Sequence, residues 1–280
     1  MRVEFKTMVL GIVATGGLLA ATAWPQSDSI PSLPFTTRRA LGFFLPLSDS
    51  VSRLPFTTRR WHGLFLALQA PLPPATSLDR VLKQMDDAAR TFRSTQASVV
   101  WDRYDSVIRE SETQTGKIYF RREGGEIQMS VEFDKPDLMY VIYSGGKVQV
   151  YQPKIDQLNL YDPGKNRGDV ESFLVLGFGG AGHDLPKSYD LKFLGTENVD
   201  GVAAEQLELI PKSVSLRNNI ARILLWIDPA RGISVQQEFF EPGGNHKLAK
   251  YSDIKMNQSL PDNAFKLKTT KKTRVISAQG

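Results

Sequence analysis

The clearest local pattern in the chain is the segment KIYFRREGGEIQMSVEF, residues 117–133. In its second half, apolar and polar residues alternate without a break from Glu126 to Phe133, which is the period of a strand that buries one face. The intervening Glu123-Gly124-Gly125 has the composition of a tight turn. The segment therefore predicts a β-hairpin with one apolar face.

Similar patterns extend from this hairpin in both directions along the chain. Short apolar-rich runs are separated by turn signals such as Ser144-Gly145-Gly146 and Glu241-Pro242-Gly243-Gly244-Asn245. About eleven short strands in hairpin succession predict a mainly β protein with a meandering antiparallel sheet that is curled or closed. The expected strands are Thr95–Arg109, Lys117–Arg122, Glu126–Phe133, Leu138–Tyr143, Lys147–Tyr151, Gln157–Tyr161, Tyr189–Leu194, Ala203–Ile210, Ile220–Ile227, Ile233–Phe240 and Lys247–Lys255.

Two segments have the periodicity of a helix. Ser77 can cap a helix that runs to about Phe92, with its apolar residues spaced to fall on one side. The second candidate is Asp169–Phe178. Because a helix with one apolar stripe needs a partner surface, we expect both helices to lie against the sheet.

The composition argues against several kinds of site. The chain has 280 residues, no cysteine and three histidines. Without cysteine there is no disulfide, thiol nucleophile or thiolate metal site, and three histidines argue against a histidine metal centre. We therefore expect no metal and no cofactor. Residues 1–75 hold seven basic and three acidic residues, so most of the net charge of +5 lies in the N-terminal quarter, which argues against a nucleic-acid-binding protein.

The N-terminus has the pattern of an export signal. Arg2 and Lys6 precede an apolar run at residues 8–20, and Ala21-Thr22-Ala23 has the small residues of a cleavage site. The alternative is an uncleaved membrane anchor, but the run is shorter than the roughly 20 residues needed to span a bilayer. We therefore interpret residues 1–23 as a signal peptide.

A duplication lies within residues 24–76. Ser27–Arg39 recurs as Ser48–Arg60, with ten of thirteen positions identical. The Arg-Arg pair in each copy gives a weak likeness to a twin-arginine export signal. Two copies are too few for a repeat array. We interpret residues 24–76 as a poorly ordered leader and linker, followed by the main domain at 77–276 and a tail at 277–280.

The sequence offers no catalytic motif. The glycine-rich Phe178–His183 follows a helix-like segment and not a strand, so we interpret it as a flexible loop and not as a phosphate-binding loop. Carboxylates such as Glu126 and Glu132 fall mostly at solvent-facing positions of the expected strands. These observations predict a protein that is not an enzyme.

Many apolar residues of the main domain can share one face of the sheet. Two interpretations stay open, because periodicity does not separate a packed core from the lining of a cavity. A cavity lined by Met and Phe would adapt to flexible chains. The candidate lipid-cavity residues are Ile118, Phe120, Ile127, Met129, Val131, Phe133, Val148, Val150, Leu158, Leu160, Ile223, Leu225 and Ile227.

Several motifs, in the right order, resemble the periplasmic outer-membrane lipoprotein carrier (LolA-like) family. Gly116–Arg122 resembles the family's early strand, which ends in a basic pair. Lys135–Leu138 and Ser144–Pro153 resemble its next conserved segment, and Leu207–Lys212 resembles a later strand. Asn263–Leu267 resembles its final strand. The likeness extends over essentially all of residues 77–276.

This resemblance implies a fold and a function. Members fold as an open, strongly curved antiparallel sheet, an incomplete barrel, with a helical lid over an apolar cavity. Carriers of the family take the acyl chains of lipoproteins from the inner membrane through the periplasm to the outer membrane. The implied partners are acylated lipoproteins, an inner-membrane release complex and an outer-membrane acceptor. The protein is then expected to be a periplasmic monomer.

The resemblance also implies a lid latch at Arg122. In the family's carriers an arginine at the end of the early strand helps to hold the lid closed, and Arg122 has that place in the motif. The family's proline after the basic pair is replaced here by Glu123. The other interpretation of Arg122 is a solvent-facing residue of an edge strand.

A second function is compatible with the same fold. The fold also resembles periplasmic proteins that sense lipids or mislocalised lipoproteins and regulate a stress-signalling partner. Such sensors usually carry a second domain, and the short stretch Lys266–Gly280 after Phe265 offers none. The sequence therefore favours the carrier.

Overall fold

A single sheet organises residues 76–261 and 263–279, the part of the chain that the computed structural model describes. The order of its twelve strands is β12-β6-β5-β4-β3-β2-β1-β11-β10-β9-β8-β7. The chain builds the sheet as two meanders, β1 to β6 and β7 to β11, which join where β1 pairs with β11. The outermost strands β12 and β7 do not pair with each other, so the sheet is open. The prediction of a mainly β, open antiparallel sheet is confirmed.

The observed elements follow the predicted ones closely. All eleven expected strands are present, and the twelfth is β12 at the C-terminal end. The strands are β1 (Ser94–Asp105), β2 (Glu110–Glu123), β3 (Glu126–Lys135), β4 (Met139–Ser144), β5 (Lys147–Gln152), β6 (Gln157–Asp162), β7 (Tyr189–Val199), β8 (Val202–Pro211), β9 (Arg222–Asp228), β10 (Ile233–Phe240), β11 (His246–Met256) and β12 (Arg274–Gln279). The helices are α2 (Ser77–Thr91), α3 (Arg167–Leu174), α4 (Leu185–Ser188) and α5 (Val214–Arg217), with short 3₁₀ turns η1 (Pro153–Ile155), η2 (Gly164–Asn166) and η3 (Gly182–Asp184).

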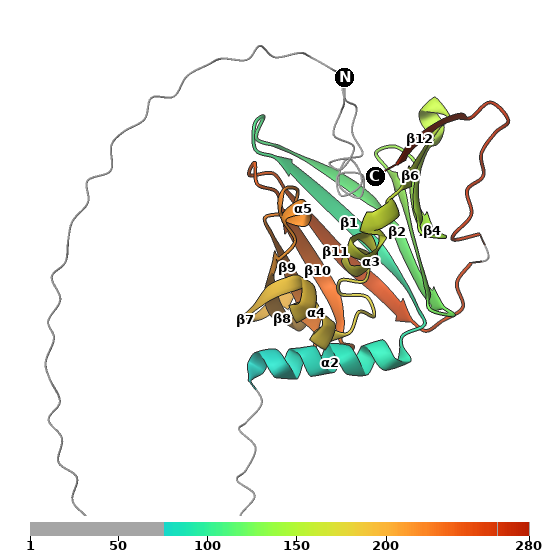
Figure 1. Ribbon diagram of the computed structural model, residues 1–280. Helices are drawn as coiled ribbons and strands as arrows, with labels where there is room; N and C mark the ends of the chain where they lie inside the picture. Colours follow the sequence, from blue (N-terminus) through green and yellow to red (C-terminus); the bar gives the residue numbers. More distant parts are fainter. Residues whose placement is uncertain (1–75, 262, 280) are drawn as a thin grey trace, which may run out of the picture. The chain divides into compact units, whose positions relative to one another are not determined.

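The sheet bends so that both meanders turn toward one concave side (Figure 1). Helix α3 and the segment after it lie on that side, and α2 crosses one end of the sheet. The helical cover that the resemblance implies is therefore present, and its position is on the face where the strands bury their apolar side chains.

Helix α2 begins one residue earlier than the sequence suggested. Thr76, and not Ser77, is the cap: its Oγ1 accepts a hydrogen bond from the Asp79 amide at 3.1 Å, and the Asp79 carboxylate accepts one from the Thr76 amide at 3.2 Å. This reciprocal pair is a capping box, which satisfies two backbone donors of the first turn. The apolar stripe is buried as expected, at Val81, Leu82 and Met85.

The end of the chain differs from the prediction. Asn263–Leu267 was expected to be the final strand, but residues 263–265 form a turn and 266–267 no regular structure. The final strand is β12, which pairs parallel with β6 and crosses residue 276, where the main domain was expected to end. Asp156 fixes the approach to β12, because its carboxylate accepts hydrogen bonds of 2.7 Å from the Thr270 and Thr273 hydroxyls.

The expected signal peptide at residues 1–23 and the duplicated segment lie outside the described residues. Helix α2 opens the described part of the chain directly after them, with Thr76 at its cap.

Strand alternation places the main core on the concave face. Leu207 and Leu209 of β8 and Leu225 of β9 are fully buried there, while Ile210 next to Leu209 remains 39% exposed on the other face. A smaller cluster on the opposite face of β9 includes Trp226. The concave core therefore contributes most of the apolar burial.

Truncation of Leu209 tests which face is the core. We expect Leu209→Ala to lower the free energy of unfolding by about 2–5 kcal/mol, because it leaves a cavity in fully buried surroundings. Ile210→Ala, one residue along the same strand, should cost less than about 1 kcal/mol. Urea denaturation of both variants measures the difference, and equal losses would contradict this assignment of the faces.

Candidate functional site

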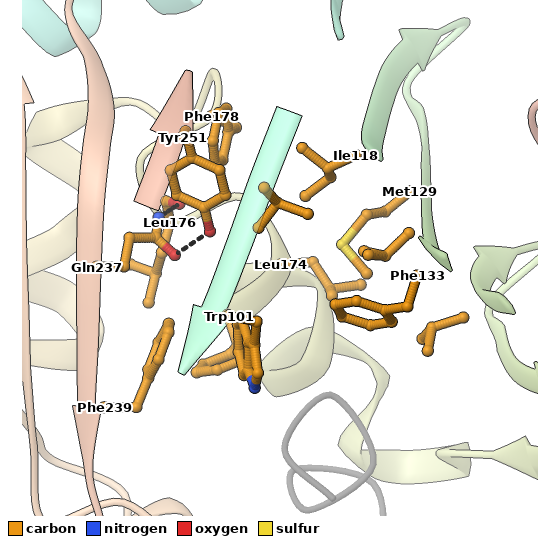
Figure 2. A pocket seen from close by; sticks show the side chains of 14 residues that line it. Trp101, Ile118, Met129, Phe133, Leu174, Leu176, Phe178, Gln237, Phe239 and Tyr251 are labelled. Atoms are coloured by element: carbon orange, nitrogen blue, oxygen red, sulfur yellow. Dashed lines mark hydrogen bonds between the residues drawn. The ribbon is translucent and has the colours of Figure 1, made fainter. Parts of the chain in front are cut away.

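The concave face contains a cavity of about 50 Å³ under the α3 segment (Figure 2). Strands β1 to β4, β10 and β11 form its floor, and residues 167–182, which we call the lid, form its cover. Figure 2 shows Leu174 of the lid opposite Met129 and Phe133 of the sheet. The full lining is Val99, Trp101, Ile118, Met129, Val131, Phe133, Val141, Phe173, Leu174, Leu176, Phe178, Gln237, Phe239 and Tyr251.

The lid begins with the short helix α3. Asp169 lies in its first turn, where a carboxylate interacts favourably with the helix dipole. Val170 and Leu174 lie four residues apart, on one face of the helix, and both are buried. The helix therefore turns an apolar edge toward the sheet and continues the lining.

Two polar side chains in the lining hold the lid to the sheet. The Gln237 side-chain amide of β10 donates a hydrogen bond of 2.6 Å to the Leu176 carbonyl oxygen of the lid. The Gln237 side-chain oxygen accepts a hydrogen bond of 3.1 Å from the Tyr251 hydroxyl. Burial raises the pKa of Tyr251 above its ordinary value, so the hydroxyl keeps the proton that it donates.

Backbone contacts bring the lid still closer to the sheet at Gly177. The Ser234 amide donates a hydrogen bond of 2.8 Å to the Gly177 carbonyl oxygen. A Cβ on Gly177 would lie 2.4 Å from the Ser234 Cβ, and the φ of +74° also favours glycine. Gly182 lies equally close to α2, because a Cβ there would meet the Leu82 carbonyl oxygen at 2.2 Å. The glycine-rich stretch, which we interpreted as a flexible loop, therefore packs tightly in the structure.

A polar cluster fixes α3 itself. The Tyr143 hydroxyl of β4 donates a hydrogen bond of 2.6 Å to the Glu171 carboxylate, and Arg167 pairs with the same carboxylate at 2.8 Å. Burial and the bond to Glu171 raise the pKa of Tyr143. The start of the lid is thus bound to the sheet by groups other than the predicted latch.

The predicted cavity residues divide into three groups. Four of them line the cavity, namely Ile118, Met129, Val131 and Phe133. Seven belong to the core or pack against it without lining the cavity, namely Phe120, Ile127, Val148, Val150, Ile223, Leu225 and Ile227. Two on β6 are half-buried and lie outside both core clusters, namely Leu158 and Leu160.

Arg122 lies near the end of β2, as the motif predicts, and its backbone amide donates to the Arg93 carbonyl oxygen. Its guanidinium makes no hydrogen bond or ion pair with any residue that the structure describes. Arg121 is the engaged member of the basic pair: it bonds Gln128 and lies over the Phe265 ring, with 4.8 Å between the guanidinium carbon and the ring centroid. The role of Arg122 as a latch therefore stays a proposal.

The sequence analysis did not single out the residues that hold the lid. Gln237 stands in the polar pair Gln236-Gln237, where alternation does not say which side chain faces inward. Tyr251 and Trp101 belong to strands that were predicted, and the alternation of those strands was the signal that could have placed both side chains on the inward face.

Within residues 76–261 and 263–279, His, Asp and Glu form no group of three that could bind a metal. None of the helices in that part of the chain has the length and apolarity to cross a membrane.

The family model described as "Outer membrane lipoprotein carrier protein LolA" matches residues 91–268, more than half of the chain. The chain belongs to the LolA family. The LolA family consists of binding and carrier proteins and not of enzymes. The resemblance noted in the sequence is confirmed.

Several solved structures are also similar to this chain. An uncharacterized conserved protein from Thermus thermophilus has 15% identity and a TM-score of 0.47 over 72% of this chain and 100% of its own. A chain of the MucA/MucB complex of Pseudomonas aeruginosa has 17% identity and a TM-score of 0.43 over 69% and 62%. The Mycobacterium tuberculosis lipoprotein LppX has 13% identity and a TM-score of 0.39 over 66% and 97%. None of the curated proteins matches the sequence.

Replacement of Gln237 tests whether its amide holds the lid. Gln237→Met keeps the size of the side chain but leaves the Leu176 carbonyl and the Tyr251 hydroxyl without their partner, which costs about 1–3 kcal/mol. We expect amide hydrogen exchange in residues 170–180 to accelerate about tenfold or more. Gln236→Met, on the other face of β10, is the matched control, and equal exchange in both variants would contradict the assignment.

Proposed function

We propose that the protein is a periplasmic carrier that binds the acyl chains of lipoproteins between the sheet and the lid. It would shuttle them from an inner-membrane release complex to an outer-membrane acceptor. The observation that carries this proposal is a cavity whose lining is apolar except at the groups that hold its cover. A site built this way has no group to transform a ligand, but it has a surface to shield one from water.

The size of the cavity supports a mobile cover. A single water molecule needs about 10–15 Å³ of cavity volume, so a cavity of about 50 Å³ has room for only a few water molecules. An acyl chain therefore enters only when the lid moves away from the sheet. The structure would then represent the closed, empty form of the carrier.

The energetics allow such an exchange. Burial of an acyl chain contributes about 0.8 kcal/mol per CH₂, so ten buried groups contribute about 8 kcal/mol. Displacement of the lid breaks the bonds from Gln237 and Ser234, each with a net contribution of about 1 kcal/mol. Displacement also takes apolar side chains of the lid, such as Leu174 and Leu176, away from the sheet. Because this loss offsets more of the gain, the carrier can also release its cargo to a more apolar acceptor.

The proposed place of action follows from the N-terminal pattern. Residues 1–23 would direct export and be removed, which would leave the carrier in the periplasm. Arg122 would help to hold the lid in the closed form, as the family motif implies.

Binding of acylated peptide tests the proposal. We expect the exported protein to bind a dipalmitoylated peptide and not the same peptide without acyl chains, as measured by native mass spectrometry. Val131→Phe places extra volume on the cavity floor and should weaken binding at least tenfold. Ile210→Phe, on the exposed face of β8, should bind as the unchanged protein does.

Three outcomes would contradict this proposal. Equal affinity for the acylated and the unacylated peptide would show that the acyl chains do not contribute to binding. Tight binding of acylated peptide that Val131→Phe leaves unchanged would place the acyl chains elsewhere on the protein. Absence of acyl binding, together with a stable complex with a signalling protein, would favour the sensor.

A further inference from the structure

On the concave face, the strand positions next to the cavity lining carry charged side chains in place of apolar ones. Trp101 of β1 and Phe239 of β10 line the cavity. On β1 the next inward-facing position after Trp101 is Arg103, which pairs in register with Lys247 of β11. Lys247 also pairs in register with Phe239 on its other side. Since residues two apart on a strand share a face, both cationic side chains lie on the cavity side of the sheet.

Each of these cations has an acidic partner. Lys247 forms an ion pair with Glu241 at the end of β10, and Arg103 forms one with Glu112 of β2. We call Glu112, Arg103, Lys247 and Glu241 the charged row. The Lys247 side chain is only 4% exposed, whereas Arg103 is 27% and Glu112 39% exposed. Lys247 is thus the buried member of the row, and the side chains on both sides of it are partly exposed.

A buried lysine at this place needs a reason other than stability. Further along the same register row the inward-facing side chains are Phe239, Ile223 and Leu209, which form apolar core. Burial lowers the pKa of Lys247, the bond to Glu241 offsets part of this effect, and the positive charge of Arg103 lowers it further. Because Lys247 is almost completely desolvated, and a buried ion is on balance no more stabilising than a packed apolar residue, stability alone does not account for this lysine.

Resting on the proposed binding of acyl chains, we infer that the charged row holds the anionic phosphate head of an amphiphile whose chain lies in the cavity. An acyl chain seated against Trp101 and Phe239 brings its polar end to the next inward-facing positions. A phosphate would replace Glu112 and Glu241 as the partner of the two adjacent cations, and the planar Arg103 guanidinium matches the geometry of phosphate oxygens. The two flanking carboxylates can accept hydrogen bonds from other polar groups of the head.

Two amphiphiles with the same chain and different heads test this inference. We expect the full chain to bind dodecyl phosphate about tenfold more tightly than dodecanol, both below micelle-forming concentration, as measured by competition with a fluorescent fatty-acyl probe. In the double variant Lys247→Met/Glu241→Gln this preference should fall below twofold, while the affinity for dodecanol stays the same. The double change leaves the net charge unaltered and leaves no buried ion without its partner.

A matched control separates the site from general charge effects. Lys154→Met/Asp137→Asn removes an exposed ion pair with the same balance of charge, and it should keep the tenfold preference. Inorganic phosphate alone should not displace dodecyl phosphate at millimolar concentration, since it lacks the chain. Displacement by inorganic phosphate would identify a site for free anions and overturn the assignment to a lipid head.

The remaining outcomes separate this inference from the proposed function. Equal affinity for the two amphiphiles, or a preference that survives in the Lys247/Glu241 double variant, would overturn the head site and leave the acyl cavity standing. If neither amphiphile binds the unchanged protein, both the head site and the proposed carrier are overturned.

Discussion

The hydrogen bond from the Gln237 amide to the Leu176 carbonyl oxygen is the contact on which the closed site depends. Both groups lie in apolar surroundings, where a polar group without a partner costs about 1–3 kcal/mol. With the lid closed, Gln237 is satisfied on both sides, by Leu176 and by Tyr251. An acyl chain offers no hydrogen bond in exchange. In the proposed carrier, the closed, empty lid and an open, loaded site would therefore be alternatives, since the chain would compete with these polar contacts for the same space.

The contacts at the two ends of the lid indicate where the proposed opening would take place. At its start, Glu171 is bound by Tyr143 and Arg167. Directly after its end, the His183 amide donates a hydrogen bond of 3.1 Å to the Asp86 carboxylate of α2, and the two side chains form a second contact. Between these anchors the lid meets the sheet through apolar packing and the bonds from Gln237 and Ser234. Opening can therefore be confined to the centre of the lid while both ends stay in place.

The sequence predicted most of the sheet because alternation and turn residues are local signals. It did not predict β12, since Arg274–Gln279 joins β6 in parallel through contacts that are distant in sequence. It also did not separate the lining of the cavity from the packed core. Alternation puts Ile223 and Met129 on the same face, but only the position of the lid decides that Met129 lines the cavity and Ile223 lies in packed core.

The contacts between the lid and the sheet could not be predicted from the sequence for a similar reason. The register of β10 against β9 shifts between Ser234 and Gln236, so the strand does not keep one phase of alternation along its length. This shift buries both Ser234 and Gln237, the two residues of β10 that bind the lid. A single sequence does not reveal such a bulge. The Arg122 motif was visible in the sequence, whereas the residues seen to hold the lid carry no motif.

Hydrogen exchange at the Ser234 amide tests the central claim most directly. This amide donates to the Gly177 carbonyl oxygen of the lid, so its exchange reports on whether the lid is closed on the sheet. With saturating dipalmitoylated peptide, we predict that Ser234 exchanges at least tenfold faster, while amides between β8 and β9 exchange as before. Unchanged protection of Ser234 in the loaded protein would contradict the account, because the acyl chain would then be bound without displacement of the lid.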